Sequence, residues 1–462
     1  MGCIVADGRA CAPYTGPMDW LDSLPDTRVL RAPEALHDYT HDESHVVGPL
    51  PRAVVKPRSA AALRQLVQRA GAEGFTLVPR GAGSGKAGGC VPSEGAVVVD
   101  LSDWPGSIAV NRDDLTLSAP SSAWLRDVRS AAEAQGLWYP PDPNSWPLCS
   151  FGGSLATNAG GPNACKYGMT RRWVLAVDAL MADGEIHRFG IGSVKQNTGP
   201  NLAQLMVGSE GVFGMILGAT VALIPQAREH LTVLLPLDDA ALLPALPARL
   251  FGAGLMPSAL EFWDAAVLND LRTHGPDAAR RLPGEALALL EFDDAGCTSG
   301  EFIERLLSAL GDIALHAEVA TGAGQREALW NVRRMTSVHL KQRFPKKVSE
   351  DVVVPRSRLP EFFARLHTLA MPSVSYGHLG DGNLHVNLLH AGELEGAALE
   401  SELEPLFALC LELGGTLSGE HGIGLAKRDA FLRHTDPYTV SALRAMKHAL
   451  DPKGVFNAGK VF

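Results

Sequence analysis

The pattern of hydrophobic and polar positions changes once along the chain, near residue 228. Between residues 53 and 225, the apolar runs FTLVPR, GAVVVDL, VLAVDALMA and MILGATVALI alternate with glycine-rich turns, which predicts short strands. Residues 59–72 place Leu63, Leu66 and Val67 on one face, which predicts an amphipathic helix. Beyond residue 228, the strand-like runs LTVLLPL, ALALLEF and HAEVAT alternate with helical stretches. This second part is typical of a sheet backed by helices, so the predicted fold class is α+β.

The length of the chain predicts more than one domain, because 462 residues exceed what a single hydrophobic core usually organises. We expect a short, helical, aspartate-rich segment at 1–46 and a first domain at 47–227. A second domain should span 228–415. After Gly415 the chain returns to a loop and two short helices, so 416–462 should be a C-terminal segment that contacts both domains and completes the active site.

Composition and charge exclude several classes of protein. Hydrophobic residues make up 46% and charged residues 20% of the chain, which is typical of a compact globular protein. The net charge of -10 and the lack of a long basic run argue against nucleic acid as a partner. No apolar run approaches the roughly 20 residues that cross a bilayer, and the first 25 residues lack the apolar core of a signal peptide.

The seven cysteines are scattered and include no Cys-x-x-Cys pair, which argues against a disulfide framework, a zinc ribbon and an iron–sulfur cluster. We therefore expect reduced thiols in a cytoplasmic protein, and association with the periphery of a membrane stays open.

The first segment with candidate chemistry is the glycine-rich run at residues 79–89, PRGAGSGKAGG. Glycines allow backbone N–H groups to close on an anion, because no Cβ blocks their approach. The run is not a P-loop, since three rather than four residues separate Gly81 from Gly85 and Ala87 follows Lys86. It is not a Rossmann loop either, because a strand-like run follows it. A pyrophosphate held by backbone groups fits best, and a flexible hairpin is the alternative.

Two further small-residue segments favour the cofactor over the hairpin. One is FGGSLATNAGG at residues 151–161 and the other is GSEGVFG at residues 208–214. Three such segments separated by strands can surround a long, flat dinucleotide with donors from the backbone and from Ser, Thr and Asn side chains.

Together these segments resemble the vanillyl-alcohol-oxidase/PCMH superfamily, in the branch of D-lactate dehydrogenases, glycolate oxidase catalytic subunits and D-2-hydroxyglutarate dehydrogenases. The landmarks are PRGAGSGKAGG, SFGGSLATNAGGPNACKYGMT, VDALMADGEI, KQNTGPNL and GSEGVFG, and the resemblance extends from about Tyr39 to Lys460. It implies a two-subdomain PCMH-type FAD-binding domain, a cap domain with an antiparallel sheet covered by helices, and a helical tail that returns to the FAD domain.

The resemblance also implies which residues line the FAD. The first loop has no histidine of the kind that links flavin covalently in some members, so we expect FAD to be bound non-covalently. The implied lining residues are Arg80, Gly81, Ala82, Gly83, Ser84, Gly85, Gly88, Gly89, Pro141, Ser150, Gly153, Thr157, Asn158, Gly160, Gly161, Gly168, Glu210, Gly211 and Asn457.

The second group of candidate residues lies in GHLGDGNLHVN at residues 377–387 and SGEHGIG at 418–424. Gly380 and Gly382 argue against a helix, so a tight turn should fold the first segment back and bring His378 and His385 together. Imidazoles with a carboxylate such as Glu420 suit Zn²⁺ or Mn²⁺. From the residues alone, hydrogen-bonded structural roles are favoured over a metal site.

Both segments are also signatures of the branch named above. The resemblance implies that His378, His385 and Glu420 bind a divalent metal, Zn or Mn. It implies that His421 is the catalytic base and that Asn387 contacts the substrate. A bound metal would lower the pKa of a substrate hydroxyl, His421 would take its proton, and hydride would pass from Cα to the flavin.

The last feature expected of the active site is a cation that binds the substrate carboxylate. Trp330-Asn331-Val332-Arg333 matches the Trp-x-x-Arg helix of the family, and Arg333 can clamp a carboxylate in a bidentate manner, with a solvated surface arginine as the alternative. The 2-hydroxyglutarate enzymes carry a lysine where this chain has Ser349, which favours lactate- or glycolate-like acids. A cation from Arg343, Lys346 or Lys347 can still compensate.

The leading hypothesis is an FAD-dependent D-2-hydroxy-acid dehydrogenase that passes electrons to a quinone, a cytochrome or an electron-transfer flavoprotein. A D-2-hydroxyglutarate dehydrogenase and the catalytic subunit of a glycolate-oxidase-like complex are alternatives, and both a homodimer and a subunit of such a complex stay open. A flavin-binding scaffold without catalysis and a hydrolytic metalloprotein without flavin are the candidates from other classes. Alkyl-glycerone-phosphate synthases share the fold, but the histidine motifs point away from them.

Overall fold

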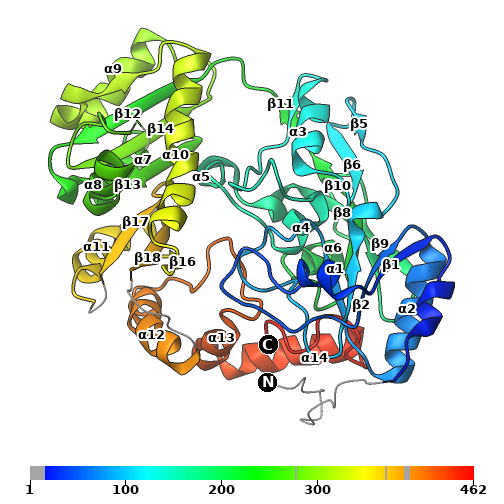
Figure 1. Cartoon of the computed structure of the whole chain (residues 1–462). Helices are drawn as coiled ribbons and strands as arrows, with labels where there is room; N and C mark the ends of the chain where they lie inside the picture. Colours follow the sequence, from blue (N-terminus) through cyan, green and yellow to red (C-terminus); the bar gives the residue numbers. More distant parts are fainter. Residues whose placement is uncertain (1–15, 276, 278, 370–371, 390–395) are drawn as a thin grey trace. The chain divides into compact units, whose positions relative to one another are not determined.

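The computed structural model describes residues 16–275, 277, 279–369, 372–389 and 396–462 (Figure 1). The chain divides into two compact units. Unit 1 comprises the described residues of 1–159, 169–226 and 420–462, and unit 2 comprises those of 160–168 and 227–419. The domain boundaries expected from the sequence remain predictions. Cys3 and Cys11 lie outside the described residues, and the five described cysteines form no disulfide.

Unit 1 contains three sheets. The first has the strand order β1-β2-β4-β3, the second β5-β6-β10-β8-β9 and the third β11-β7. Strand β4 pairs in parallel with β2 and β3, whereas the five-stranded sheet is antiparallel throughout. The strands are β1 (Thr27–Leu30), β2 (Ala53–Pro57), β3 (Leu77–Arg80), β4 (Val97–Asp100), β5 (Ala109–Asn111), β6 (Thr116–Pro120), β7 (Leu137–Trp138), β8 (Val174–Leu180), β9 (Ile186–Gly190), β10 (Met215–Ala222) and β11 (Ile224–Pro225).

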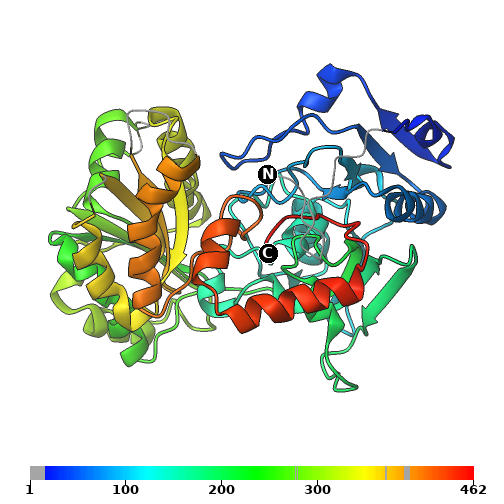
Figure 2. The same ribbon diagram turned by 90° about the horizontal axis from the view of Figure 1, so that it is seen from below.

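The helices of unit 1 cover its sheets and include the C-terminal tail. The predicted amphipathic helix is α2 (Ala60–Glu73), which buries Leu63, Leu66 and Val67 and begins after Ser59, whose side chain accepts from Ala62 N. The tail returns to this unit as expected, and α14 appears in red in Figure 2. The other helices are α1 (Pro33–His37), α3 (Leu125–Glu133), α4 (Phe151–Ala156), α6 (Leu202–Met206), α13 (Arg428–His434) and α14 (Pro437–Leu450), with 3-10 turns at Asp19–Ser23, Leu101–Asp103 and Thr170–Trp173.

The N-terminal segment is not wholly helical, which corrects the description of 1–46. Strand β1 lies within it and pairs antiparallel with β2. The run Thr27–Leu30 gains ladder hydrogen bonds by extending the edge of a sheet whose other strands are strongly apolar, and this tertiary partner is not visible in local propensity.

Unit 2 is one seven-stranded antiparallel sheet with helices on it, in the order β15-β12-β14-β13-β17-β18-β16. Its strands are β12 (Leu231–Leu237), β13 (Ala259–Trp263), β14 (Ala286–Phe292), β15 (Glu318–Val319), β16 (Val348–Val353), β17 (Ser373–His378) and β18 (Asn383–Leu388). Its helices are α5 (Ala164–Tyr167), α7 (Leu246–Gly252), α8 (Ala265–His274), α9 (Gly300–Leu310), α10 (Ala323–Arg343), α11 (Leu359–Leu366) and α12 (Gly396–Glu412), with 3-10 turns at Ala240–Ala245, Gly311–His316 and Arg356–Arg358.

The two faces of this sheet differ in chemistry. Side chains alternate between faces along a strand, and partners across an antiparallel ladder share a face. On one face, Phe262 packs edge-on against Phe363 of α11, and Phe292 packs in the same way against Phe302 of α9. The opposite face lies against α10, where Trp263 Nε1 donates to Thr336 Oγ1 over 2.8 Å. This second face also carries the two histidines of β17 and β18.

A four-residue turn joins β17 to β18, as the glycines of the sequence predicted. Gly382 has a φ of +82°, and a Cβ there would lie 2.2 Å from the carbonyl oxygen of Val354. A side chain at this position would therefore be strained by the backbone and blocked by its neighbour. The turn sets the register in which His378 lies opposite Asn383, and Tyr376 opposite His385.

No helix among the described residues is long and apolar enough to cross a membrane.

Candidate functional site

The three glycine-rich segments pack against one another within unit 1. A Cβ added at Gly81 would lie 2.2 Å from Ser150 Oγ, and one at Gly89 would lie 3.3 Å from Glu210 Oε2. The first segment therefore lies close to both of the others, with no room for a Cβ at Gly81 and little room at Gly89. This is the arrangement expected if the segments expose their backbone along one cofactor.

The C-terminal tail joins the same cluster of segments. Asn457 Nδ2 donates to the carbonyl oxygens of Gly89, over 2.9 Å, and Glu210, over 2.6 Å. Lys460 Nζ donates to Gly89 O over 2.7 Å, and its side chain is fully buried. Burial lowers the pKa of Lys460 to about 8, against the opposing effect of nearby acidic groups. The sequence prediction included Asn457 but missed Lys460, for which the only signal was a lysine in the apolar ending GVFNAGKVF.

Unusual backbone conformations and unsatisfied polar atoms gather at these residues. Asn158, Glu210 and Asn457 adopt φ values of +50°, +51° and +45°, which are costly for residues other than glycine. Among the described residues, the buried atoms Ser209 Oγ, Glu210 Oε2 and Asn457 Oδ1 have no hydrogen-bond partner. Buried polar atoms without a partner are rare in folded proteins, and a bound polar group is one arrangement that satisfies them. The cluster therefore fits a polar, extended cofactor such as FAD.

Several other predicted FAD-lining residues make contacts of their own within the protein. Arg80 donates to His41 O over 2.8 Å and lies over the ring of Tyr39. Ser150 Oγ caps α4 by accepting from Gly153 N, and Thr157 Oγ1 donates to Gly153 O. The segment with Gly160, Gly161 and Gly168 is grouped with unit 2. The roles of Ala82, Gly83, Ser84, Gly85, Gly88, Pro141 and Gly211 in binding FAD likewise remain predictions.

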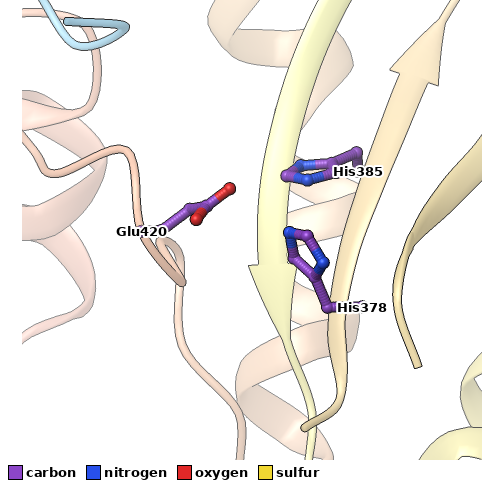
Figure 3. Close-up of side chains that lie close together, drawn as sticks. All are labelled: His378, His385 and Glu420. Carbon is purple, nitrogen blue, oxygen red and sulfur yellow. The ribbon is translucent and has the colours of Figure 1, made fainter. Parts of the chain in front are cut away.

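The histidine pair lies on the α10-facing side of the sheet in unit 2. The rings of His378 and His385 have centroids 5.1 Å apart at an interplanar angle of 78°. Both side chains are buried. Together with Glu420 they offer ligand atoms that all lie within 4.8 Å of one another. Figure 3 shows the three side chains directed toward one another. Two imidazoles and one carboxylate at this spacing fit a divalent ion such as Zn²⁺ or Mn²⁺.

Glu420 is placed by the residues before it, which are tied to β16. Gly419 N donates to Asp351 O over 3.0 Å and to Asp351 Oδ2 over 2.9 Å, and Ser418 Oγ donates to Asp351 Oδ1 over 3.2 Å. A Cβ at Gly419 would lie 2.2 Å from Asn383 Nδ2, so glycine permits this close approach. Asp351, itself fully buried and opposite His385, is a residue that the sequence prediction did not assign to the site.

The two other predicted catalytic residues near the histidines have distinct surroundings. Asn387 is fully buried on β18, and its Oδ1 accepts from Lys347 Nζ over 2.6 Å. His421 follows Glu420 directly and is half-buried. The contact of Lys347 with Asn387 brings a cation beside a residue expected to contact substrate.

Arg333 is buried rather than exposed, which excludes the solvated surface arginine. Its Nε donates to Glu261 Oε2 over 2.6 Å, and its guanidinium lies 4.9 Å from the centroid of the Tyr376 ring. Among the described residues, no hydrogen-bond partner is seen for its two Nη atoms. These two nitrogens therefore remain available for a carboxylate.

Two buried glutamates on this face were missed by the sequence prediction. Glu261 on β13 accepts from Arg333 and also lies 2.7 Å from His378 Nδ1. Glu291 on β14 accepts from Trp330 Nε1 over 2.9 Å and from Arg326. Burial alone would raise the pKa of Glu291, but hydrogen bonds from His230, Arg326 and Thr232 hold it at about 2. The available signal was a single carboxylate inside each of the apolar strands ALEFW and ALALLEF.

Comparison with known proteins identifies the family. The model described as "FAD linked oxidases, C-terminal domain" matches residues 224–461, and the model described as "FAD binding domain" matches residues 51–190. The chain belongs to the FAD-linked oxidase family. It is thus a flavin-dependent oxidoreductase, and the predicted cofactor FAD and the predicted resemblance are confirmed.

Curated relatives align over nearly the whole chain. A D-lactate dehydrogenase of Archaeoglobus fulgidus is 32% identical over 461 residues, covering 96% of this chain and 99% of the relative. The glycolate oxidase subunit GlcD of Bacillus subtilis is 30% identical over 437 residues, covering 92% of each chain. A D-2-hydroxyglutarate dehydrogenase of Xanthomonas citri pv. viticola is 31% identical over 453 residues, covering 95% of each.

Solved structures confirm the predicted α+β fold. The 4-ethylphenol oxidase from Gulosibacter chungangensis, in complex with isoeugenol, matches with a TM-score of 0.74 over 94% of both chains at 17% sequence identity. An alkyldihydroxyacetonephosphate synthase matches with a TM-score of 0.68 over 100% of this chain and 89% of its own, also at 17% identity. At this identity the likeness concerns the fold.

Glu210 generates a prediction about pH and stability. Burial raises its pKa from 4.5 to about 7, despite hydrogen bonds from the N–H groups of Ile423 and Gly424. Between these two pH values, the folded state keeps a proton on Glu210 that the unfolded state has released. The free energy of unfolding should therefore fall as pH rises from about 4.5 to 7. At about 1.4 kcal/mol per pKa unit, this loss is at most on the order of 3 kcal/mol. Glu210→Gln should remove it, making FAD-free protein more stable than wild type at pH 8 but not at pH 4.5.

Urea unfolding of the FAD-free protein across this pH range is the measurement. Glu94→Gln is the control, because it removes the same charge from an exposed position of the same unit. Parallel pH profiles for wild type and Glu210→Gln would contradict the prediction.

Proposed function

We propose that this flavoenzyme oxidises a small D-2-hydroxy acid to the 2-oxo acid with the help of a divalent metal. The observation that carries the proposal is the group formed by His378, His385 and Glu420, whose ligand atoms lie within 4.8 Å of one another. A metal there would bind the hydroxyl and carboxylate of the acid, and would favour loss of the hydroxyl proton. The printed names of the curated relatives, which include D-lactate and D-2-hydroxyglutarate dehydrogenases, support the substrate class.

Residues of the chain then have separate tasks in the reaction. Bound FAD supplies the hydride acceptor that no side chain can provide. Arg333, through its Nη atoms, would hold the substrate carboxylate and fix the orientation of Cα, and Asn387 would contact the substrate. His421 would accept the hydroxyl proton on a ring nitrogen as hydride leaves Cα.

Lactate- or glycolate-like acids are the proposed substrates, because Ser349 on β16 lies opposite Asn387 where a lysine is expected in the 2-hydroxyglutarate enzymes. D-2-hydroxyglutarate remains the second candidate. Lys347 favours it, because its Nζ lies 2.6 Å from Asn387 Oδ1 and offers a cation for a second carboxylate. Electrons would leave the flavin for a non-nicotinamide acceptor, such as a quinone, a cytochrome or an electron-transfer flavoprotein. The GlcD relatives support the alternative of a catalytic subunit in an oxidase complex.

Anaerobic flavin bleaching tests the proposed reaction. Purified protein loaded with FAD and Mn²⁺ is mixed in turn with D-lactate, L-lactate, glycolate and D-2-hydroxyglutarate, and the visible spectrum is followed. We expect D-lactate or glycolate to bleach the flavin band and L-lactate to leave it unchanged. Bleaching by D-2-hydroxyglutarate alone would select the second candidate. A flavin band that resists every acid would contradict the proposed substrate class.

The proposed role of His421 has its own test. His421→Ala should lower the rate of anaerobic flavin reduction by about 100-fold or more, because general-base catalysis contributes about 10²–10⁴-fold. FAD content should stay at the wild-type level. His448→Ala, at an exposed histidine on α14, is the matched control and should reduce at the wild-type rate. Reduction of His421→Ala at the wild-type rate would remove His421 from the role of base.

A further inference from the structure

We infer that Glu261 is a positioning residue that orients both the metal ligand His378 and the carboxylate clamp Arg333. The inference rests on the proposed function, because it takes His378 as a metal ligand. Glu261 lies on β13, directly opposite His378 in the antiparallel ladder with β17. Its side chain is fully excluded from solvent.

The two carboxylate oxygens of Glu261 serve two different partners. Oε1 lies 2.7 Å from His378 Nδ1, and Oε2 accepts from Arg333 Nε over 2.6 Å. His378 and Arg333 are themselves buried, so neither side chain can exchange this partner for solvent. A carboxylate held between two donors in this way is well satisfied despite its burial.

The contact with Glu261 decides which nitrogen of His378 can bind a metal. A carboxylate only accepts hydrogen bonds, so His378 Nδ1 must carry the hydrogen. The neutral ring then presents the lone pair of Nε2 as its ligand atom. A carboxylate behind a metal-binding histidine also raises the basicity of the ring, and loss of such a partner typically costs about 10–100-fold in metal affinity.

The contact with Arg333 has a parallel consequence for the substrate. Glu261 engages the guanidinium through Nε, while the ring of Tyr376 lies against it. The planar group is fixed in orientation, with its two Nη atoms left for a substrate carboxylate. One buried side chain therefore sets the geometry of a metal ligand and of a substrate-binding cation.

Glu291 provides a matched comparison on the same face of the same sheet. It lies on β14, next to β13, and is buried like Glu261. Its partners on α10 are Trp330, three residues before Arg333, and Arg326, seven residues before it. No contact between Glu291 and either histidine of the pair is seen in the described part of the chain.

The first experiment measures metal affinity in the FAD-loaded protein. Wild type, Glu261→Gln, Glu291→Gln and His385→Ala are stripped with a chelator and titrated with Mn²⁺ or Zn²⁺ in competition with an indicator. Glutamine keeps the shape but offers only one acceptor, so it cannot satisfy both His378 and Arg333. We expect about 10–100-fold weaker binding for Glu261→Gln, near-wild-type binding for Glu291→Gln, and loss of the site in His385→Ala. FAD content should be unchanged in all four.

A second readout does not depend on metal. Nitrogen-15 spectra of the histidine rings in metal-free protein report which nitrogen is protonated, with His378 assigned by its loss in His378→Gln. Wild type should show the Nδ1–H form, and Glu261→Ala should shift His378 toward the Nε2–H form. A purely structural role of Glu261 would leave this tautomer unchanged.

The outcomes separate the inference from the proposed function. Wild-type affinity in Glu261→Gln, together with loss of binding in His385→Ala, would overturn the role of Glu261 and leave the proposed metal site standing. Absence of binding in wild type, or binding that survives in His385→Ala, would overturn the metal site. In that case His378 is no longer a metal ligand, and the tautomer decides only whether Glu261 orients its ring: Nδ1–H in wild type that is lost in Glu261→Ala supports this orienting contact, and any other result overturns it.

Discussion

The register between strands β13, β17 and β18 is the constraint on which the chemistry of unit 2 depends. It places Glu261 opposite His378, and Tyr376 opposite His385. Because side chains alternate between the faces of a sheet, a slip of one residue would move a histidine to the face packed by α9 and α11. The glycine turn at Gly382 and the apolar contacts of Phe262 on the far face hold this register. Packing on one face thus fixes the polar geometry of the other.

A different constraint governs unit 1, where the glycine-rich segments approach one another closely. Gly81 and Gly89 lie where a Cβ would meet another glycine-rich segment. Asn158, Glu210 and Asn457 accept costly backbone conformations at the same cluster. Such strained backbone conformations persist only where many contacts of the surrounding fold hold the residues in place. Ser209 Oγ, Glu210 Oε2 and Asn457 Oδ1 are buried there without a hydrogen-bond partner in the described part of the chain, which fits a polar cofactor.

The sequence predicted those features that depend on local pattern. Periodicity identified α2 and the apolar strands, and the glycines between His378 and His385 predicted the hairpin. It did not predict strand β1, whose stability comes from a partner strand. It also missed Glu261 and Lys460, because a single charged residue in an apolar run gives no indication of its partner until the chain is folded. Arg333 was assigned to the site from a motif, but its buried pairing with Glu261 depends on tertiary structure.

The proposed oxidation of the acid depends on a metal held by the histidine pair and Glu420. Its most direct test is the rate of anaerobic flavin reduction by the best D-2-hydroxy acid, in chelator-treated FAD-loaded protein titrated with Mn²⁺ or Zn²⁺. We expect the rate to be negligible without metal and to rise linearly until one ion is bound per chain. Full-rate reduction in metal-free protein would contradict it.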